Sequence, residues 1–349
     1  MRILIVLGAG ASYQCWPPGR QSLLTLPLAN GLFSTENTQD ELLNLYNLTS
    51  LAAKLRRRAV VEGNKFNIEG ELAGIKERAE KDGDFNVQKI LFKSRFYIQE
   101  LIQKLSEATI EVTRGHTLYV DFLNDLKDWI DENRRERFVD IVTFNYDTLI
   151  DKAMSTVYSH DWMVKNNESA LSAYYTGSNL RIYKPHGSIN WGRIVTRNGT
   201  DNYIYEDINQ PTNDFNSIDI TDKFKFVDPV YRTSERKDYV PAIAVPYKGK
   251  SFEECPIPMR SKMLEAIASA EAVLTIGWKG GDSHFVEELV KNSKARNVKV
   301  VSPGAMNTEL GTILQNKLVS PTDMTFADFI HKGEMSKFLN RSELPNTFL

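Results

Sequence analysis

The fold is decided by the stretch Val139-Asp140-Ile141-Val142-Thr143-Phe144-Asn145-Tyr146-Asp147, which Thr148-Leu149-Ile150-Asp151 follows directly. Apolar, β-forming residues run up to Thr143, two polar side chains then come two positions apart, and a helical spacing of apolar residues begins. This pattern predicts a buried strand that ends in a polar turn before a helix. Ligands bind beyond the carboxyl ends of the strands in an open α/β sheet, so Asn145 and Asp147 are candidates for chemistry. A structural role is the alternative, because Asp147 is suited to capping the helix and Asn145 to forming a turn.

The amino terminus carries a second strand end of the same kind. Residues 3–7 form a continuous apolar run, typical of a strand buried on both faces, and Gly8-Ala9-Gly10-Ala11-Ser12 follows. Small residues let the backbone approach a phosphate, and a helix after them would direct its first N–H groups toward that anion. Because Tyr13 stands where a full dinucleotide fingerprint has its last glycine, the turn also fits close packing of a helix on a sheet. Prolines and glycines within residues 13–30 predict a loop over the cleft.

Three later turns complete the pattern. Lys184-Pro185-His186-Gly187-Ser188 follows a short predicted strand and holds a histidine on a stiff turn, for which a buried structural role is the alternative. Gly277-Trp278 follows an apolar strand at residues 272–276, and Ser302 follows another at residues 298–301. Strand, turn and helix recur in this order, which predicts a parallel sheet with right-handed crossovers.

The fold class predicted is α/β: a Rossmann-like, doubly wound parallel sheet with a large helical insertion and a small irregular lobe. Residues 1–34 and 139–320 are expected to form this domain, and residues 321–349 a tail that contacts another subunit or a partner. Residues 35–138 are rich in Leu, Lys, Glu and Arg at helical spacing, which predicts the insertion. Within the main domain, helices are expected at residues 256–270, 283–294 and 308–317, and the small lobe at residues 188–239.

The composition excludes several classes of protein. With 43 basic and 45 acidic residues the net charge is -2, so no direct binding of nucleic acid is expected, and the basic clusters Lys54–Arg58 and Arg134–Arg137 are interpreted as solvated helix faces. Two cysteines, Cys15 and Cys255, cannot build a disulfide framework or a cysteine-based zinc module. The amino terminus has no secretory core and no apolar run approaches the ~20 residues of a membrane span, so we expect a cytoplasmic protein that does not bind membranes.

Taken together and in order, these turns resemble the sirtuin (silent information regulator two) family, and more closely its bacterial branch of NAD-hydrolysing effectors of anti-phage defence. The resemblance covers residues 1–34 and about 139–320. It implies that His186 matches the catalytic histidine and that Asn145 and Asp147 lie against the nicotinamide ribose. The residues that it implies for binding NAD are Gly8, Ala9, Gly10, Ala11 and Ser12 at the pyrophosphate, Thr143 beside them, and Gly277, Trp278 and Ser302 at the adenosine half.

One departure from the family bears on the activity. Deacylating sirtuins carry a four-cysteine zinc ribbon that helps to form the acyl-lysine cleft, and two cysteines cannot supply it. Water rather than an acyl-lysine is therefore the expected nucleophile, with NAD as the substrate and no metal. Asn145 would orient the water, His186 would accept a proton, and Asp147 would hold Asn145 or the ribose, or favour the cationic transition state. The alternatives are an NAD- or ADP-ribose-binding regulatory module without turnover and a zinc-free, NAD-dependent protein deacylase.

The resemblance also implies how such an enzyme is controlled. An enzyme that destroys NAD has to be held silent, so we expect activation by assembly or by a partner. The family suggests a homo-oligomer, completed in some cases by a ring-shaped DNA-translocating ATPase or an Argonaute-type protein.

Overall fold

Six parallel strands form the central sheet, in the order β3-β2-β1-β7-β8-β9. The computed structural model describes residues 1–16, 25–35, 40–83, 85–158, 171–197, 218–227, 239–246, 252, 254–304, 314 and 317–342. The strands of this sheet are β1 (Arg2–Leu7), β2 (Phe138–Thr143), β3 (Leu180–Tyr183), β7 (Ala272–Ile276), β8 (Asn297–Val301) and β9 (Leu318–Thr322). Neighbouring β1 and β2 are apolar along nearly their whole length because both of their faces are covered. The predicted parallel α/β sheet is confirmed.

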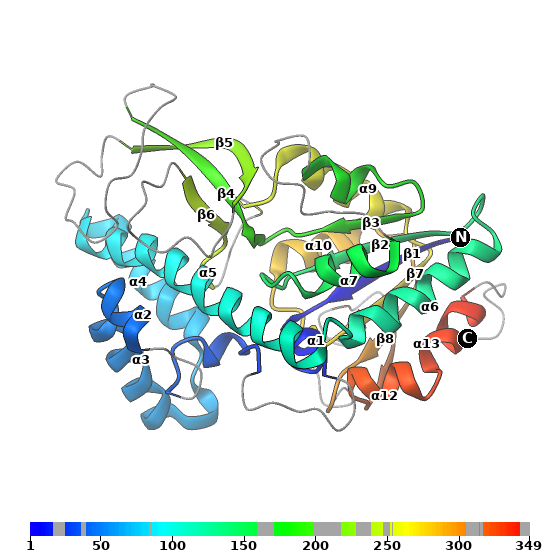
Figure 1. Cartoon of the computed structure of the whole chain (residues 1–349), viewed down its shortest axis with the longest axis horizontal. Helices are drawn as coiled ribbons and strands as arrows, with labels where there is room; N and C mark the ends of the chain where they lie inside the picture. The colour runs from blue at the N-terminus through cyan, green and yellow to red at the C-terminus, as the bar shows by residue number, and fades with distance from the viewer. Residues whose placement is uncertain are drawn as a thin grey trace.

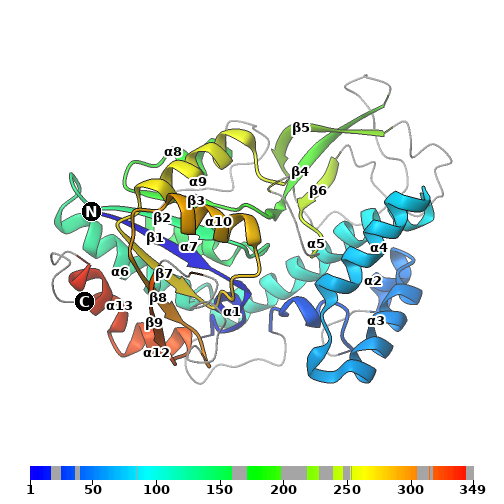
Figure 2. The same cartoon turned by 180° about the vertical axis from the view of Figure 1, so that it is seen from behind.

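Helices cover both faces of the sheet. Figures 1 and 2 show α6 (Leu118–Glu132) and α7 (Leu149–Tyr158) over one face, and α9 (Ile257–Ser269) and α10 (Ser283–Asn292) over the other. Each of these helices buries an apolar stripe, which in α6 includes Phe122 and Trp129. The short helix α1 (Ala9–Tyr13) continues directly from the end of β1.

A helical segment lies between β1 and β2, and all of its elements except η1 fall within the residues predicted as the insertion. Its elements are η1 (Ala29–Gly31), α2 (Asp40–Leu45), α3 (Thr49–Glu62), η2 (Gly63–Lys65), α4 (Ile68–Asp82) and α5 (Phe85–Thr113), and α6 leads back to the sheet. Figure 1 shows α5 as a long helix that runs from this segment past the small second sheet. Gln99 of α5 donates a 2.6 Å hydrogen bond from Nε2 to the carbonyl oxygen of Ile189, so the insertion is fixed to the chain that follows β3.

The small second sheet is antiparallel, in the order β5-β4-β6. Its strands are β4 (Gly187–Arg197), β5 (Ile218–Phe226) and β6 (Tyr239–Ile243), and a short helix, α8 (Ala173–Thr176), precedes β3. It occupies the region predicted as a small irregular lobe, of which residues 198–217 and 228–238 lie outside the described part of the chain. This sheet begins one residue after His186, and it therefore sets the position of that side chain.

The carboxyl-terminal part adds an edge strand and two helices to the main domain. Strand β9 was not predicted, and it spans residue 320, the predicted end of the main domain. Most of the predicted helix at residues 308–317 lies outside the described residues. Helices α12 (Phe326–His331) and α13 (Glu334–Arg341) pack on α6, where the Phe326 ring lies 5.6 Å from that of Tyr119. The described tail thus contacts its own domain.

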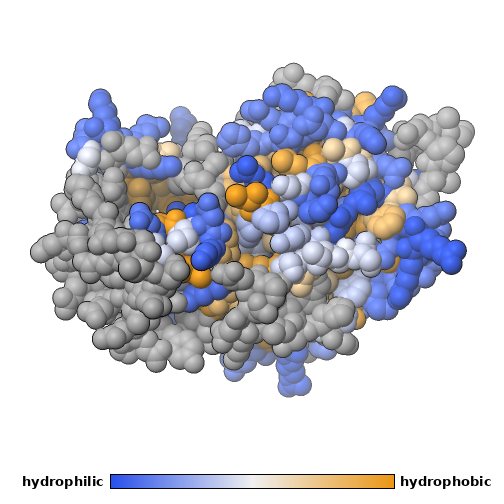
Figure 3. Space-filling model, turned by 90° about the horizontal axis from the view of Figure 1, so that it is seen from above, coloured by the Kyte–Doolittle hydropathy of each residue, from blue (hydrophilic) through white to orange (hydrophobic). Residues whose placement is uncertain are grey.

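Hydrophilic side chains cover much of the described surface in the view of Figure 3, with hydrophobic residues showing between them. Within the described ranges, no helix has the length and apolar character needed to cross a membrane.

Candidate functional site

A cavity of about 550 Å³ opens beyond the carboxyl ends of β1, β2, β7 and β8. This is the place where an open parallel sheet binds ligands. One wall comes from the strand-end turns and the opposite wall from the loop before η1 and from α4 and α5. The residues of the first wall include Gly8, Ser12, Phe144, Asn145, Asp147, His186, Gly277, Trp278, Lys279, Asp282 and Ser302; those of the second include Leu26, Leu28, Asn30, Leu32, Asn67, Glu69 and Ile102.

The cavity brings together nearly all of the site residues predicted from the sequence. These are Gly8, Ala9, Gly10, Ser12, Asn145, Asp147, His186, Gly277, Trp278 and Ser302. Ala11 and Thr143 are the exceptions. Ala11 is fully buried behind the turn, and the Thr143 hydroxyl accepts a 3.2 Å hydrogen bond from the backbone N–H of Asn145. Both act on the shape of the turns and do not line the cavity.

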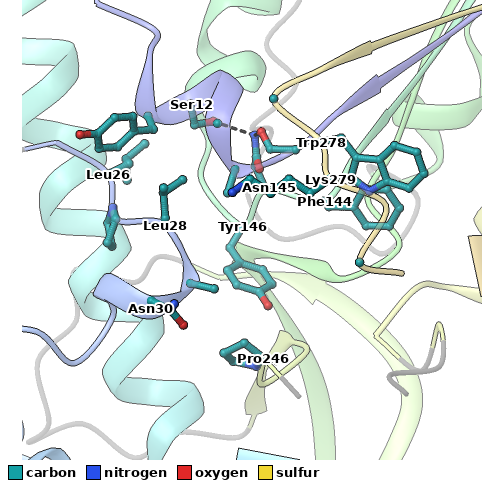
Figure 4. A pocket seen from close by; sticks show the side chains of 18 of the residues that line it. Ser12, Leu26, Leu28, Asn30, Phe144, Asn145, Tyr146, Pro246, Trp278 and Lys279 are labelled. Atoms are coloured by element: carbon teal, nitrogen blue, oxygen red, sulfur yellow. Dashed lines mark hydrogen bonds between the residues drawn. The ribbon is translucent and has the colours of Figure 1, made fainter. Parts of the chain in front are cut away.

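Asn145 is held by its amide nitrogen. Nδ2 donates to the carbonyl oxygen of Gly8 at 3.0 Å and to Oγ of Ser12 at 2.8 Å, and Figure 4 shows the second contact. A carbonyl oxygen can only accept, so the atom beside Gly8 is the nitrogen. The other end of the amide, Oδ1, is buried and has no hydrogen-bond partner among the residues that the structure describes. An unpaired buried acceptor costs free energy, so a donor from a ligand or water is expected there.

Behind Asn145 lies a tyrosine that sequence analysis did not select. The Tyr119 hydroxyl is 2.9 Å from Oγ of Ser12 and 3.4 Å from Nδ2 of Asn145. Burial raises the pKa of Tyr119 well above its ordinary value, with the nearby negative charge of Asp147 as the next cause, so the phenol stays protonated. Tyr119 belongs to α6, more than twenty residues before Asn145, and no local pattern in the sequence relates the two.

Asp147 combines the two roles considered from the sequence. Its Oδ1 accepts a 3.0 Å hydrogen bond from the backbone N–H of Leu149, so it caps the start of α7 while it lines the cavity. Loss of solvation on burial raises the pKa of Asp147, and this effect exceeds the opposing attraction of Lys184 and the hydrogen bond from Ser12. A cation beside a buried carboxylate stabilises its ionised form relative to its protonated form.

The turn that carries His186 requires glycine at the next position. Gly187 has φ +79°, and a Cβ there would lie 1.7 Å from the carbonyl oxygen of Ala242. The N–H of Gly187 donates to the carbonyl oxygen of Lys184 at 3.0 Å, and the carbonyl oxygen of His186 accepts from Ala244 at 2.9 Å. The turn bond to Lys184 and the bond from the residue after β6 therefore fix the backbone on both sides of His186.

The imidazole of His186 lies against an acidic residue of a distant turn. Its Nε2 is 2.7 Å from Oδ2 of Asp282, and both side chains are buried. The Phe144 ring packs edge-on against the imidazole, with 4.9 Å between ring centroids. Phe144 also stacks on Trp278, with 5.9 Å between ring centroids and 7° between ring planes. Figure 4 shows the two side chains beside each other. Trp278 thus supports Phe144 as well as lining the cavity.

The glycines of the first turn serve close packing. A Cβ on Gly8 would lie 2.4 Å from the carbonyl oxygen of Gly277, and a Cβ on Gly277 would lie 2.4 Å from the nitrogen of Ala11. The N–H groups of Gly8 and Gly10 donate to the carbonyl oxygens of Ile276 and Gly277. These two amides are engaged with the neighbouring turn, so contact with a phosphate would have to come from other groups.

A buried ion pair supports the turns from below. Nζ of Lys184 lies 2.7 Å from Oδ2 of Asp151, and both side chains are fully buried. The same ammonium donates to the carbonyl oxygen of Asp147 at 2.8 Å and to Oγ of Ser188 at 2.9 Å. Tyr174 donates its hydroxyl to Oδ1 of Asp151. Lys184 therefore joins the turn after β2 to the turn that carries His186.

Neither cysteine is placed for metal binding or nucleophilic chemistry. Cys15 and Cys255 are both buried and unpaired with each other, and burial raises the pKa of Cys255 to about 12. In the described part of the chain, no group of three or more His, Cys, Asp or Glu side chains is arranged to hold a metal ion.

Sequence comparison gives no match to a known protein family or to a curated protein. Structure comparison gives Sir2 homologues. A triple mutant in complex with 2'-O-acetyl-ADP-ribose is 10% identical, with 99% of this chain and 94% of that chain covered and a TM-score of 0.42. A single mutant in complex with ADP-ribose is 12% identical, with 99% and 95% covered and a TM-score of 0.39. These similarities carry no argument about this chain, and the function proposed below rests on the residues of the cavity.

Proposed function

We propose that this protein is an NAD glycohydrolase, which cleaves NAD to nicotinamide and ADP-ribose. The observation that carries the proposal is Asn145, whose buried Oδ1 has no hydrogen-bond partner among the described residues and which lines one cavity together with His186 and Asp147. An acceptor, a base and a carboxylate at two strand ends can together support hydrolysis of an N-glycosidic bond.

The reaction breaks the bond between the ribose C1' and the nicotinamide nitrogen, whose electron pair leaves with the nicotinamide. The ribose passes through an oxocarbenium-like state, and a water oxygen bonds to C1'. Asn145 Oδ1 accepts a hydrogen bond from that water and orients it, while His186 accepts its proton. Positioning of the water and removal of its proton together account for several powers of ten in rate.

Asp147 supplies negative charge beside the developing cation. The cost of burial raises the pKa of its carboxyl group in the empty protein. A positively charged nicotinamide ring or oxocarbenium beside it offsets that cost, so the ionised form and the transition state stabilise each other.

The rest of the cavity suits the remainder of the dinucleotide. A volume of about 550 Å³ lies within the range of about 300–1,000 Å³ that ligand pockets occupy. Lys279 is the basic residue among the described lining residues, and it lies in the turn after β7, near the glycine turn. We assign it to the pyrophosphate, because the amides of Gly8 and Gly10 are already bonded within the protein.

We further propose that the enzyme depletes NAD as an effector of anti-phage defence and is activated by assembly or by a partner. The motif resemblance motivates this role. A route from the surface to the site is available: α12 and α13 pack on α6, and α6 carries Tyr119, which contacts Ser12 in the cavity wall.

The test is to incubate the purified chain with NAD, alone and with candidate partners, and to measure nicotinamide and ADP-ribose by chromatography. We expect release of both, and loss of that release in His186→Ala. His116→Ala is the matched control, because His116 is exposed in the loop between α5 and α6. Tight binding of NAD with no release in any assembled state would replace the proposal with a regulatory binding module, and NAD-dependent loss of an acetyl group from a peptide would replace it with a deacylase.

A further inference from the structure

The contact between His186 and Asp282 joins two turns that are 96 residues apart. Sequence analysis selected the histidine and passed over the aspartate. Oδ2 of Asp282 lies 2.7 Å from Nε2 of His186, and their side chains are 4% and 7% exposed, so solvent hardly screens the pair.

The second oxygen of Asp282 has a separate structural partner. Oδ1 accepts a 2.8 Å hydrogen bond from the backbone N–H of Phe285, so Asp282 is the N-cap of α10. Partial positive charge at a helix amino terminus favours an ionised carboxylate. An ionised carboxylate can only accept hydrogen bonds, and Nε2 of His186 is therefore the donor.

The direction of this hydrogen bond sets the tautomer of the imidazole. With the proton on Nε2, the lone pair of the neutral ring is on Nδ1. Packing of Phe144 against the ring restricts its rotation, and the backbone on both sides of His186 is fixed by hydrogen bonds. One orientation and one tautomer are thus selected together.

We propose that Asp282 is a positioning residue for His186, which keeps Nδ1 as the proton acceptor and stabilises the imidazolium that forms during hydrolysis. The inference rests on the proposed function. In the balanced step, the water O–H bond breaks as the C1'–O bond forms, and Nδ1 receives the proton. Asp282 remains ionised and accepts from Nε2–H throughout, and the imidazolium returns the proton to solvent after the products leave.

Other titratable groups also line the cavity. They are Tyr13, Glu69, Tyr146, Asp147 and, in the turn before α10, Lys279. Lys184 lies two residues before His186, but its ammonium forms an ion pair with Asp151 beneath the turns. The Asp282 carboxylate lies within hydrogen-bond distance of the imidazole. The effect of its removal can therefore be measured apart from theirs.

Asp282→Asn is the decisive variant. Asparagine is as good an N-cap as aspartate, so α10 keeps its Phe285 contact, but the charge is lost and an amide N–H can face the ring. We expect kcat to fall by about 10²-fold to 10⁴-fold with KM nearly unchanged, as when a buried aspartate that orients a catalytic histidine is neutralised. The pH at which kcat reaches half its maximum should fall, because the imidazolium loses its partner, and Asp282→Glu should restore part of the rate.

The tautomer itself gives a readout that needs no turnover. Nitrogen-15 NMR of the protein without NAD reports the tautomer of His186, whose signals are assigned by their loss in His186→Gln. We expect the proton on Nε2 in the wild type. In Asp282→Asn we expect the proton to shift toward Nδ1. If the wild type shows this pattern but releases no nicotinamide, the proposed function fails and the pairing holds. An unchanged tautomer in Asp282→Asn, or a gain in rate in that variant, overturns the positioning role.

Discussion

The side-chain nitrogen of Asn145 lies 3.0 Å from the carbonyl oxygen of Gly8 and ties the turn after β2 to the turn after β1. The two residues follow neighbouring parallel strands, whose ends meet at one edge of the sheet. Because Gly8 fixes the nitrogen, the oxygen of the amide is the end left for a ligand or water. These contacts fix the orientation of the Asn145 amide and therefore of its acceptor atom, Oδ1.

Replacement of Asn145 by alanine removes that acceptor. We expect Asn145→Ala to lower kcat for nicotinamide release by about 10²-fold to 10³-fold, the range seen when one positioned hydrogen-bonding group is removed from an active site. Unfolding free energy should fall by only about 1 kcal/mol for the lost hydrogen bonds. Asn292→Ala, at the exposed end of α10, is the control for removing an amide. Full turnover by a folded Asn145→Ala protein would contradict the assigned role.

Asp147 predicts a pH dependence of stability with a definite sign. Burial raises its pKa, so between its ordinary value of 3.8 and the raised value the folded protein binds more protons than the unfolded chain. The contribution of Asp147 to unfolding free energy therefore falls as the pH rises through this window and stays low above it. Asp147→Asn keeps an acceptor for Leu149, so it should be at least as stable as wild type at pH 7 and lose that advantage near pH 4.

Urea unfolding at several pH values measures this difference, and nicotinamide release by the same variant measures its cost. We expect kcat to fall, because the carboxylate no longer stabilises the cationic sugar. A variant that is less stable than wild type at pH 7 would show that the sign is wrong.

Glycine at position 187 is predicted to be essential for folding of the histidine turn. Gly187→Ala places a Cβ against the carbonyl oxygen of Ala242 at positive φ, so unfolding free energy should fall by more than about 1 kcal/mol. Gly74→Ala is the matched control: it lies within α4, where a Cβ meets nothing within 4 Å, and it should gain about 0.5–1 kcal/mol. Equal stability of the two variants in urea would contradict the geometry of the turn.

The buried Lys184–Asp151 pair predicts a large loss when one partner is removed. Lys184→Met leaves the Asp151 charge buried without its cation, and unfolding free energy should fall by about 3–5 kcal/mol. Lys184→Met combined with Asp151→Leu removes both charges and should recover part of this loss. Denaturation in urea measures both variants, and a double variant less stable than Lys184→Met would argue against charge burial as the cause.

Lys279 predicts a binding effect that depends on salt. Lys279→Ala should raise KM for NAD about two- to fivefold with kcat unchanged, since an exposed charge contributes about 0.2–1 kcal/mol. The effect should shrink as ionic strength rises. Lys291→Ala, on the exposed face of α10, controls for the change in net charge. A fall in kcat with KM unchanged would assign Lys279 to a different step.

Much of the sheet could be predicted because its strands are apolar on both faces and end at glycine or polar turns, as in residues 3–8 and 139–145. Strand β9 was missed because an edge strand is short and partly exposed, and Leu318 and Pro321 give no apolar run. The predicted domain boundaries and binding roles stay predictions. Two of the structural alternatives also have a basis in the structure: Asp147 caps α7, and Gly8 packs on Gly277.

The remaining residues of the site could not be identified from local sequence patterns. Asp282 is an ordinary helix cap in the sequence, and only the fold brings it to His186. Leu28 lies in the predicted loop over the cleft and Glu69 in the predicted insertion, neither with a motif of its own, yet both line a wall of the cavity. Such contacts depend on how distant turns are brought together, and neither spacing nor composition records that.

The pairing of the histidine turn with β6 has a consequence for the growing polypeptide on the ribosome. The carbonyl oxygen of His186 bonds to the amide of Ala244 and its imidazole contacts Asp282, so the side chain takes its position only after residue 282 has been translated. Incomplete chains would hold the glycine turn and Asn145 with no seated histidine. Under the proposed function, a nascent chain would therefore leave NAD intact at least until residue 282 has been translated.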